Sequence, residues 1–135
     1  MKKFTKIMAV ALVAVLALAA LVACGPASDP KKAAQALKDN GYAVVSVIGA
    51  DGTLSQAALD VTAKAAGLEA GDIIATVTAT SGSESISITY FKNASVASKY
   101  WKENKDSMPE KEGWVGKQSG SMIYYGTEQA VKDAH

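Results

Sequence analysis

The stretch "DIIATVTATSGSESISITYF", residues 72–91, has the most regular pattern in the chain. Apolar residues alternate with Thr before the polar loop at 81–83, and apolar residues alternate with Ser and Thr after it. Two alternating segments joined by a short loop predict an antiparallel hairpin. One face of this hairpin is apolar and the other is lined by hydroxyl groups, which is typical of a sheet with one solvated face.

The segment before the hairpin predicts two helices and one strand. Asp29-Pro30 is a favourable start for a helix through Asp39, because Asp caps helices and Pro suits the first helical position. "YAVVSVI", residues 42–48, is β-branched and apolar on both faces, as expected of a central strand. A second helix begins near Thr53 and ends at Gly67. Its helically spaced apolar residues are Leu54, Ala58, Val61 and Ala65.

The segment after the hairpin predicts a helix over 93–104, a charged surface loop over 102–113, and two short strands at 114–115 and 122–125. A last short helix runs from 127 to about 134. The resulting order, β-α-β-β-α-β with an extra helix at each end, predicts an α+β fold with the ferredoxin-like split βαβ antiparallel sheet. This topology places strand 42–48 in the middle of the sheet and strand 73–80 at an edge. Another α+β sheet order stays open.

The N-terminal segment has the pattern of a secretory signal peptide. Lys2, Lys3 and Lys6 precede an uncharged segment, 7–23, that contains only Ile, Met, Ala, Val and Leu. This apolar core is shorter than the ~20 residues that a comfortable membrane-spanning helix needs. An uncleaved signal anchor is the alternative.

Leu21-Val22-Ala23-Cys24 resembles the lipobox of bacterial lipoproteins. The resemblance implies that residues 1–23 are removed and that Cys24 receives a diacylglycerol thioether and becomes the acylated N-terminus. Residues 24–28 are then the lipidated cysteine and a short tether, and residues 29–135 form a single α+β domain. Two long acyl chains anchor a protein stably. The expected location is extracytoplasmic, on a monoderm cell surface or in the periplasm or outer membrane of a diderm.

The chain lacks the residues that several classes of function require. The chain has no Arg, and without residues 1–23 its formal net charge is about −2, which argues against nucleic-acid binding. The only histidine is the terminal His135, so neither a catalytic triad nor a transition-metal site is expected. The carboxylates of 103–112 lack a calcium-loop spacing and alternate with lysines. We therefore expect no enzyme activity and no cofactor.

Aromatic residues are concentrated in the second half of the chain. Neighbours in a strand point to opposite faces, so Phe91, Trp114 and either Tyr124 or Tyr125 could form an aromatic platform on the open Ser/Thr face. The alternative is that these side chains fill the core. The sequence therefore predicts a small, non-catalytic protein-interaction module, which could associate with itself or with a larger protein through the open sheet face. The alternative function is binding of a cell-wall glycan or small ligand by the platform.

Overall fold

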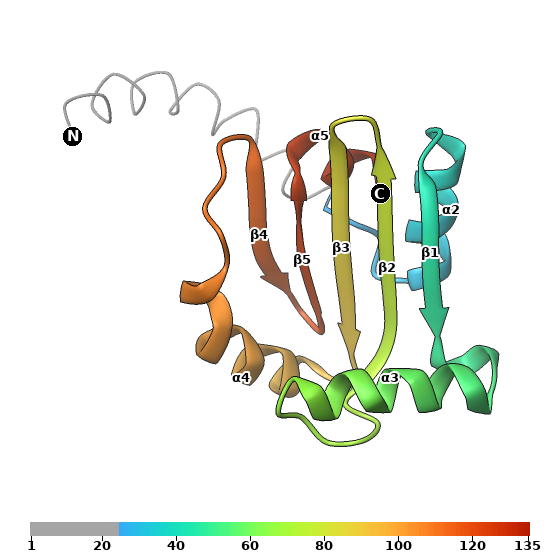
Figure 1. Ribbon diagram of the computed structural model, residues 1–135, viewed down its shortest axis with the longest axis vertical. Coiled ribbons are helices and arrows are strands. Elements are labelled where there is room, and N and C mark those ends of the chain that lie inside the picture. Colours follow the sequence, from blue (N-terminus) through green and yellow to red (C-terminus); the bar gives the residue numbers. More distant parts are fainter. Residues whose placement is uncertain (1–24) are drawn as a thin grey trace.

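The computed structural model describes residues 25–135, which form an α+β fold (Figure 1). The α-helices of this part are α2 (Pro30–Asp39), α3 (Thr53–Ala65), α4 (Ala94–Asn104) and α5 (Glu128–Asp133). The strands are β1 (Ala43–Ile48), β2 (Ile73–Ser81), β3 (Glu84–Phe91), β4 (Trp114–Ser119) and β5 (Met122–Thr127). Single 3-10 turns, η1 (Gly49–Asp51) and η2 (Lys105–Ser107), follow β1 and α4. Cys24 and the apolar N-terminal segment lie outside the described residues.

The strands form one antiparallel sheet in the order β1-β2-β3-β5-β4. The ferredoxin-like expectation is therefore wrong in its strand order, since β1 lies at an edge and β2 lies inside the sheet. Figure 1 shows the reason: α3 lies across the lower end of the sheet, so the chain leaves β1 and enters β2 at the same end. Strands connected in this way run antiparallel as neighbours, whereas the split βαβ arrangement inserts a strand between them.

The face of the sheet that carries the apolar positions of the hairpin is covered by α2 and α5. Val77, Ile86 and Ile88 are buried there, and Ala33 and Leu37 of α2 and Ala130 of α5 pack in the same cluster. The opposite face has a smaller cluster under α3 and α4, which lie over its lower end only (Figure 1). The members of this cluster are Leu59, Ala63, Ile73, Phe91, Ala97 and Ile123. The upper half of that face is left open.

Helix α3 forms where the sequence predicts it, but the apolar stripe at Leu54 and Val61 faces solvent. These two side chains are 88% and 70% exposed, while Leu59 and Ala63 make the contact with the sheet. The Gln56 side chain connects the first turn of α3 to the sheet. It donates hydrogen bonds to Asp60 Oδ1 at 2.8 Å and to the carbonyl oxygen of Ile73 at 3.2 Å, which holds α3 to the start of β2.

The tether residues pack directly on the folded domain. Pro26 is buried, and the Ala27 amide donates to the carbonyl oxygen of Ala134 at 2.9 Å. The Tyr90 hydroxyl donates to the carbonyl oxygen of Ala27 at 2.8 Å, and His135 Nδ1 lies 3.1 Å from the carbonyl oxygen of Gly25. Ala27 also packs against the cluster under α2 and α5. The described chain therefore begins on the covered face of the sheet, beside its own C-terminus.

Asp72 joins the start of β2 to the end of β3. Its carboxylate accepts a hydrogen bond from the Glu69 amide at 3.0 Å and lies 2.9 Å from Lys92 Nζ. The Glu69 hydrogen bond and then Lys92 hold the pKa of the Asp72 carboxyl below its ordinary value of 3.8. A lowered carboxyl pKa stabilises the folded state at pH values above the unfolded pKa, and this stabilisation is lost as the pH falls through the folded pKa.

The variant Asp72→Asn should therefore unfold at a lower urea concentration than the wild type at pH 7, and the difference should shrink as the pH falls below 3.8. Urea unfolding at pH 7 and pH 3 measures both effects. Asp51→Asn is the matched control, because Asp51 contacts Lys31 at 3.1 Å with both side chains at least half exposed, and such pairs contribute little. Equal midpoints for Asp72→Asn and the wild type at pH 7 would contradict this role.

Candidate functional site

The upper half of one sheet face is not covered by any helix of the described chain (Figure 1). Strand register places hydroxyl side chains opposite each other here, with Thr78 beside Ser87 and Thr80 beside Ser85. Val45 of β1 lies opposite Thr78 and is 69% exposed. We call this surface the open face, and its residues are Val45, Thr78, Thr80, Ser85, Ser87, Trp114 and Tyr125.

An aromatic pair lies at the β4–β5 end of the open face. The ring centroids of Trp114 and Tyr125 are 5.0 Å apart, with the rings tilted by 34°, and both residues are partly exposed. Gly116, opposite Tyr125, leaves the space that the ring and Met108 occupy. A Cβ at Gly116 would lie 2.8 Å from Met108 Sδ and 3.1 Å from the Tyr125 ring. The absence of a side chain at Gly116 therefore allows the pair to pack.

The loop between α4 and β4 holds this pair in place. The Tyr125 hydroxyl donates to the carbonyl oxygen of Pro109 at 2.6 Å. Lys111 Nζ lies 4.9 Å from the centre of the Trp114 ring, in the position of a cation–π contact. The charged loop thus packs against the aromatic pair, and the pair presents a partly covered, ordered surface instead of two free rings.

Two of the four candidate platform residues lie elsewhere, and of the two tyrosines it is Tyr125 that faces the open side. Phe91 is 1% exposed beneath α3 and α4, where its ring centroid is 5.6 Å from that of Tyr100. Tyr124 is 4% exposed on the opposite face of the sheet, and burial raises the pKa of its hydroxyl. The structure brings Trp114 and Tyr125 together on the open face and separates Phe91 and Tyr124 from them. The expected platform of Phe91, Trp114 and one of the two tyrosines is therefore reduced to the pair Trp114 and Tyr125.

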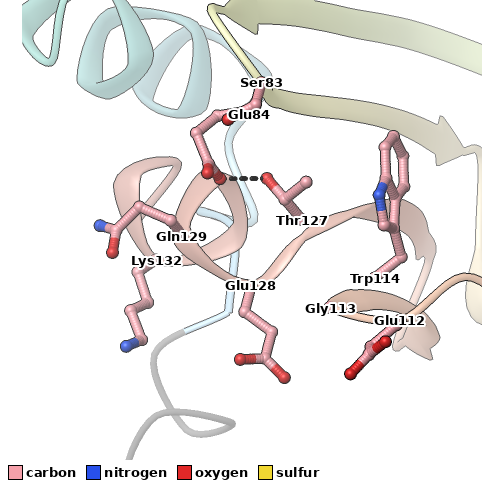
Figure 2. Close-up of a pocket in the computed structure, with 9 residues that line it drawn as sticks. All are labelled: Ser83, Glu84, Glu112, Gly113, Trp114, Thr127, Glu128, Gln129 and Lys132. Atoms are coloured by element: carbon pink, nitrogen blue, oxygen red, sulfur yellow. Dashed lines mark hydrogen bonds between the residues drawn. The ribbon is translucent and has the colours of Figure 1, made fainter.

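A polar pocket of about 430 Å³ adjoins Trp114 at the upper end of the strands (Figure 2). Within it, Thr127 Oγ1 donates to Glu84 Oε2 at 2.5 Å, and the Ser85 amide donates to Thr127 Oγ1 at 3.3 Å. Figure 2 shows the Glu112 and Glu128 carboxylates pointing away from Glu84. We call this cavity the end pocket, and it is lined by Ser83, Glu84, Glu112, Gly113, Trp114, Thr127, Glu128, Gln129 and Lys132.

The carboxylates of the end pocket do not meet in one cluster, and residues 25–135 contain no group of three or more acidic, His or Cys side chains that could hold a metal ion. The sequence could not reveal this pocket, because its residues come from five separate places: the β2–β3 turn with the start of β3, the end of the α4–β4 loop, the start of β4, the end of β5, and α5. The sequence did indicate the hydroxyl face and the aromatic residues near it, but not which aromatic residues are exposed.

Comparison with protein-family models, curated proteins and solved structures finds no match to this chain. Among residues 25–135, no helix combines the length and the apolar character required to cross a membrane. The function is therefore inferred from the surface geometry and from the N-terminal sequence.

Proposed function

We propose that this protein is a lipid-anchored lipoprotein of the bacterial cell envelope that acts as a non-catalytic protein-interaction module through its open face. The observation that carries the proposal is the uncovered upper half of one sheet face. Val45 is 69% exposed at the β1 edge of this face, and the Trp114–Tyr125 pair lies at its β4–β5 edge. Antiparallel sheets commonly have one solvated face, so the features that single out this surface are the exposed Val45 side chain and the aromatic pair.

The shape and chemistry of the open face fit a protein surface better than a small molecule. Small ligands are usually held in concave, largely apolar cavities, whereas this face is a strand surface with aligned hydroxyl groups. Protein interfaces combine aromatic anchors with a polar surround. The Trp114–Tyr125 pair supplies the anchor and the Thr and Ser side chains supply the surround. Strand pairing fixes the relative positions of these side chains in the unbound protein.

The N-terminal sequence supports attachment to a membrane, and the tether supports a defined orientation. The proposed acylated residue, Cys24, directly precedes Gly25, and the chain from Pro26 is packed against the domain. Ala27 lies on the side of α2 and α5. An anchor at Cys24 would therefore hold the covered side of the sheet close to the lipid headgroups. The open face would point away from the membrane, toward partners outside it.

One observation favours the alternative, a cell-wall glycan. The Trp114 side chain lines one side of the end pocket, the Gln129 side chain lies on the opposite side, and Glu112 is also among the lining residues (Figure 2). A pocket that combines an aromatic ring with carboxylate and amide groups can stack on a sugar ring and bind its hydroxyl groups. In this alternative the glycan binds at the end pocket, beside the open face, and Val45 and the Thr side chains of β2 take no part in binding.

Cysteine labelling in intact cells tests whether the open face is occupied. Thr78→Cys and Ser87→Cys are placed on this face, and Lys102→Cys on the exposed side of α4 is the control. A partner should slow the reaction of the first two with a membrane-impermeant maleimide several-fold, relative to the purified variants, while Lys102→Cys reacts equally in both states. Protection that survives digestion of the cell wall indicates a protein, and protection lost on digestion indicates a glycan. The same rate ratio at Thr78 and Lys102 would contradict the proposal.

A further inference from the structure

Strand β1 has the composition of a central strand but lies at the edge of the sheet. Its sequence, "AVVSVI", contains no charged residue, Pro or Gly, and it pairs with β2 over its whole length without a bulge. Natural edge strands are usually protected from further pairing by Lys, Pro, bulges or short length. The opposite edge, β4, does carry Lys117 and Gly116. The two edges therefore differ, and only β1 lacks these protective features.

The middle of β1 is open to solvent on both faces. Val45 is 69% exposed on the open face, and Ala43 and Ser46 are also exposed. The outer backbone N–H and C=O groups of β1 have no neighbouring strand within the described residues. An uncharged, β-branched strand with a free edge is a site for the addition of another strand.

We propose that the strand added to β1 is β1 of a second copy, which joins the two sheets into one across a two-fold axis perpendicular to the sheet at Val45. Residues directly opposite each other in antiparallel strands share a face. A two-fold axis perpendicular to the sheet must therefore place one residue of β1 opposite the same residue of the second copy. With the axis at Val45, this side chain lies opposite its own mate, and Ala43 lies opposite Val47 of the second copy. The most exposed apolar side chain of β1 is then buried in an apolar contact. The proposal does not depend on the acylation of Cys24.

The charges of α2 fit this arrangement. This helix packs on β1 at the edge of the sheet (Figure 1), so antiparallel pairing of β1 brings the two copies of α2 side by side in opposite directions. The first turn of α2 carries Lys31 and Lys32 and no acidic residue, which is unfavourable at the positive end of a helix. Lys32 forms no ion pair within residues 25–135. The second copy would place Asp39 and the negative end of its own helix near these lysines.

The same axis also suits attachment to a membrane. A two-fold axis perpendicular to the sheet keeps the side of α2, α5 and the tether facing the same way in both copies. Both N-termini could then reach one bilayer, and both open faces would point in the opposite direction as one continuous surface. Such an isologous contact is closed, so it yields a dimer and not a filament.

The experiment is a disulfide trap in the full-length chain, made in its cell envelope. The Cα atoms of directly opposed residues in antiparallel strands are about 4.5–5.5 Å apart, within the roughly 4.4–6.8 Å that a disulfide spans. We expect Val45→Cys to give a covalent dimer on a non-reducing gel after mild oxidation or with a short bismaleimide. Its dimer fraction should exceed that of each comparison variant at least tenfold.

Three variants and the wild type define the controls. Thr78→Cys is also exposed but lies on the next strand, about 14 Å from its mate at the usual strand spacing. Leu54→Cys tests a rival contact through the exposed stripe of α3, Ser46→Cys tests a two-fold axis at Ser46 instead of Val45, and the wild type reports any reaction of Cys24. A dimer from Val45→Cys alone supports the proposal, even if open-face labelling shows no partner. Equal bands from Val45→Cys and Thr78→Cys, or a stronger band from Leu54→Cys or Ser46→Cys, would overturn it.

Discussion

The variant Cys24→Ser should accumulate as the longer chain that still carries residues 1–23, and it should take up no fatty acid. The lipobox resemblance assigns both acylation and cleavage to Cys24, so both steps should fail together when its sulfur is removed. Metabolic labelling with a fatty acid, combined with gel mobility, measures the two effects. The expected change is close to all-or-none, because this sequence contains no other cysteine.

A displaced cysteine is the control for this experiment. Adding Ser28→Cys to the Cys24→Ser chain restores a thiol four residues later, at an exposed position of the tether. This double variant should also stay uncleaved and unlabelled, because the cysteine no longer follows Leu21-Val22-Ala23. Cleavage of Cys24→Ser at the normal position would contradict the assignment, and so would a wild-type chain without label.

The variant Phe91→Ala should cause the largest loss of stability among the aromatic substitutions. Phe91 is 1% exposed and lies between the sheet and the helices α3 and α4, against Tyr100. Large-to-small substitutions at such positions cost about 3–5 kcal/mol. This is a large part of the roughly 5–15 kcal/mol that stabilises a typical domain. Urea unfolding monitored by circular dichroism gives the free energy of unfolding.

Two comparison variants keep this prediction testable. Tyr125→Ala removes a ring of similar size from the open face, where it is partly exposed, so its cost should be less than half that of Phe91→Ala. Phe91→Leu preserves most of the buried volume and should remain folded, with a loss of about 1–1.5 kcal/mol. If Tyr125→Ala were more destabilising than Phe91→Ala, the assignment of these two rings to surface and core would be incorrect.

The local elements were predictable because they depend on short-range patterns. The alternation in residues 72–91 predicted the β2–β3 hairpin, and Asp29 caps α2 with its carboxylate 2.9 Å from the Lys31 amide. The strand order was not predictable from the same patterns. "YAVVSVI" is apolar on both faces, so it was expected in the middle of the sheet, but the path of α3 across the lower end places it at the edge. The proposed pairing with a second copy would resolve this conflict.

The candidate site was predictable only in part, for a related reason. Alternation shows that Tyr124 and Tyr125 point to opposite faces, but it cannot show which face a helix covers. Phe91 has the parity of the open face and is nevertheless buried, because α3 and α4 cover the lower end of that face. Trp114 and Tyr125 occupy the uncovered upper end. The end pocket depends on contacts between segments that are more than 40 residues apart, such as Thr127 with Glu84.

Everything proposed for the cell envelope depends on a lipid group at one sulfur atom. Intact-mass analysis of the protein purified from its native host is the most direct measurement. The expected mass is that of residues 24–135 with fatty acyl groups on the first residue, and treatment that removes lipid should shift it. A mass equal to the complete chain, or to any unmodified fragment that begins elsewhere, would contradict the anchored location and with it the orientation of the open face.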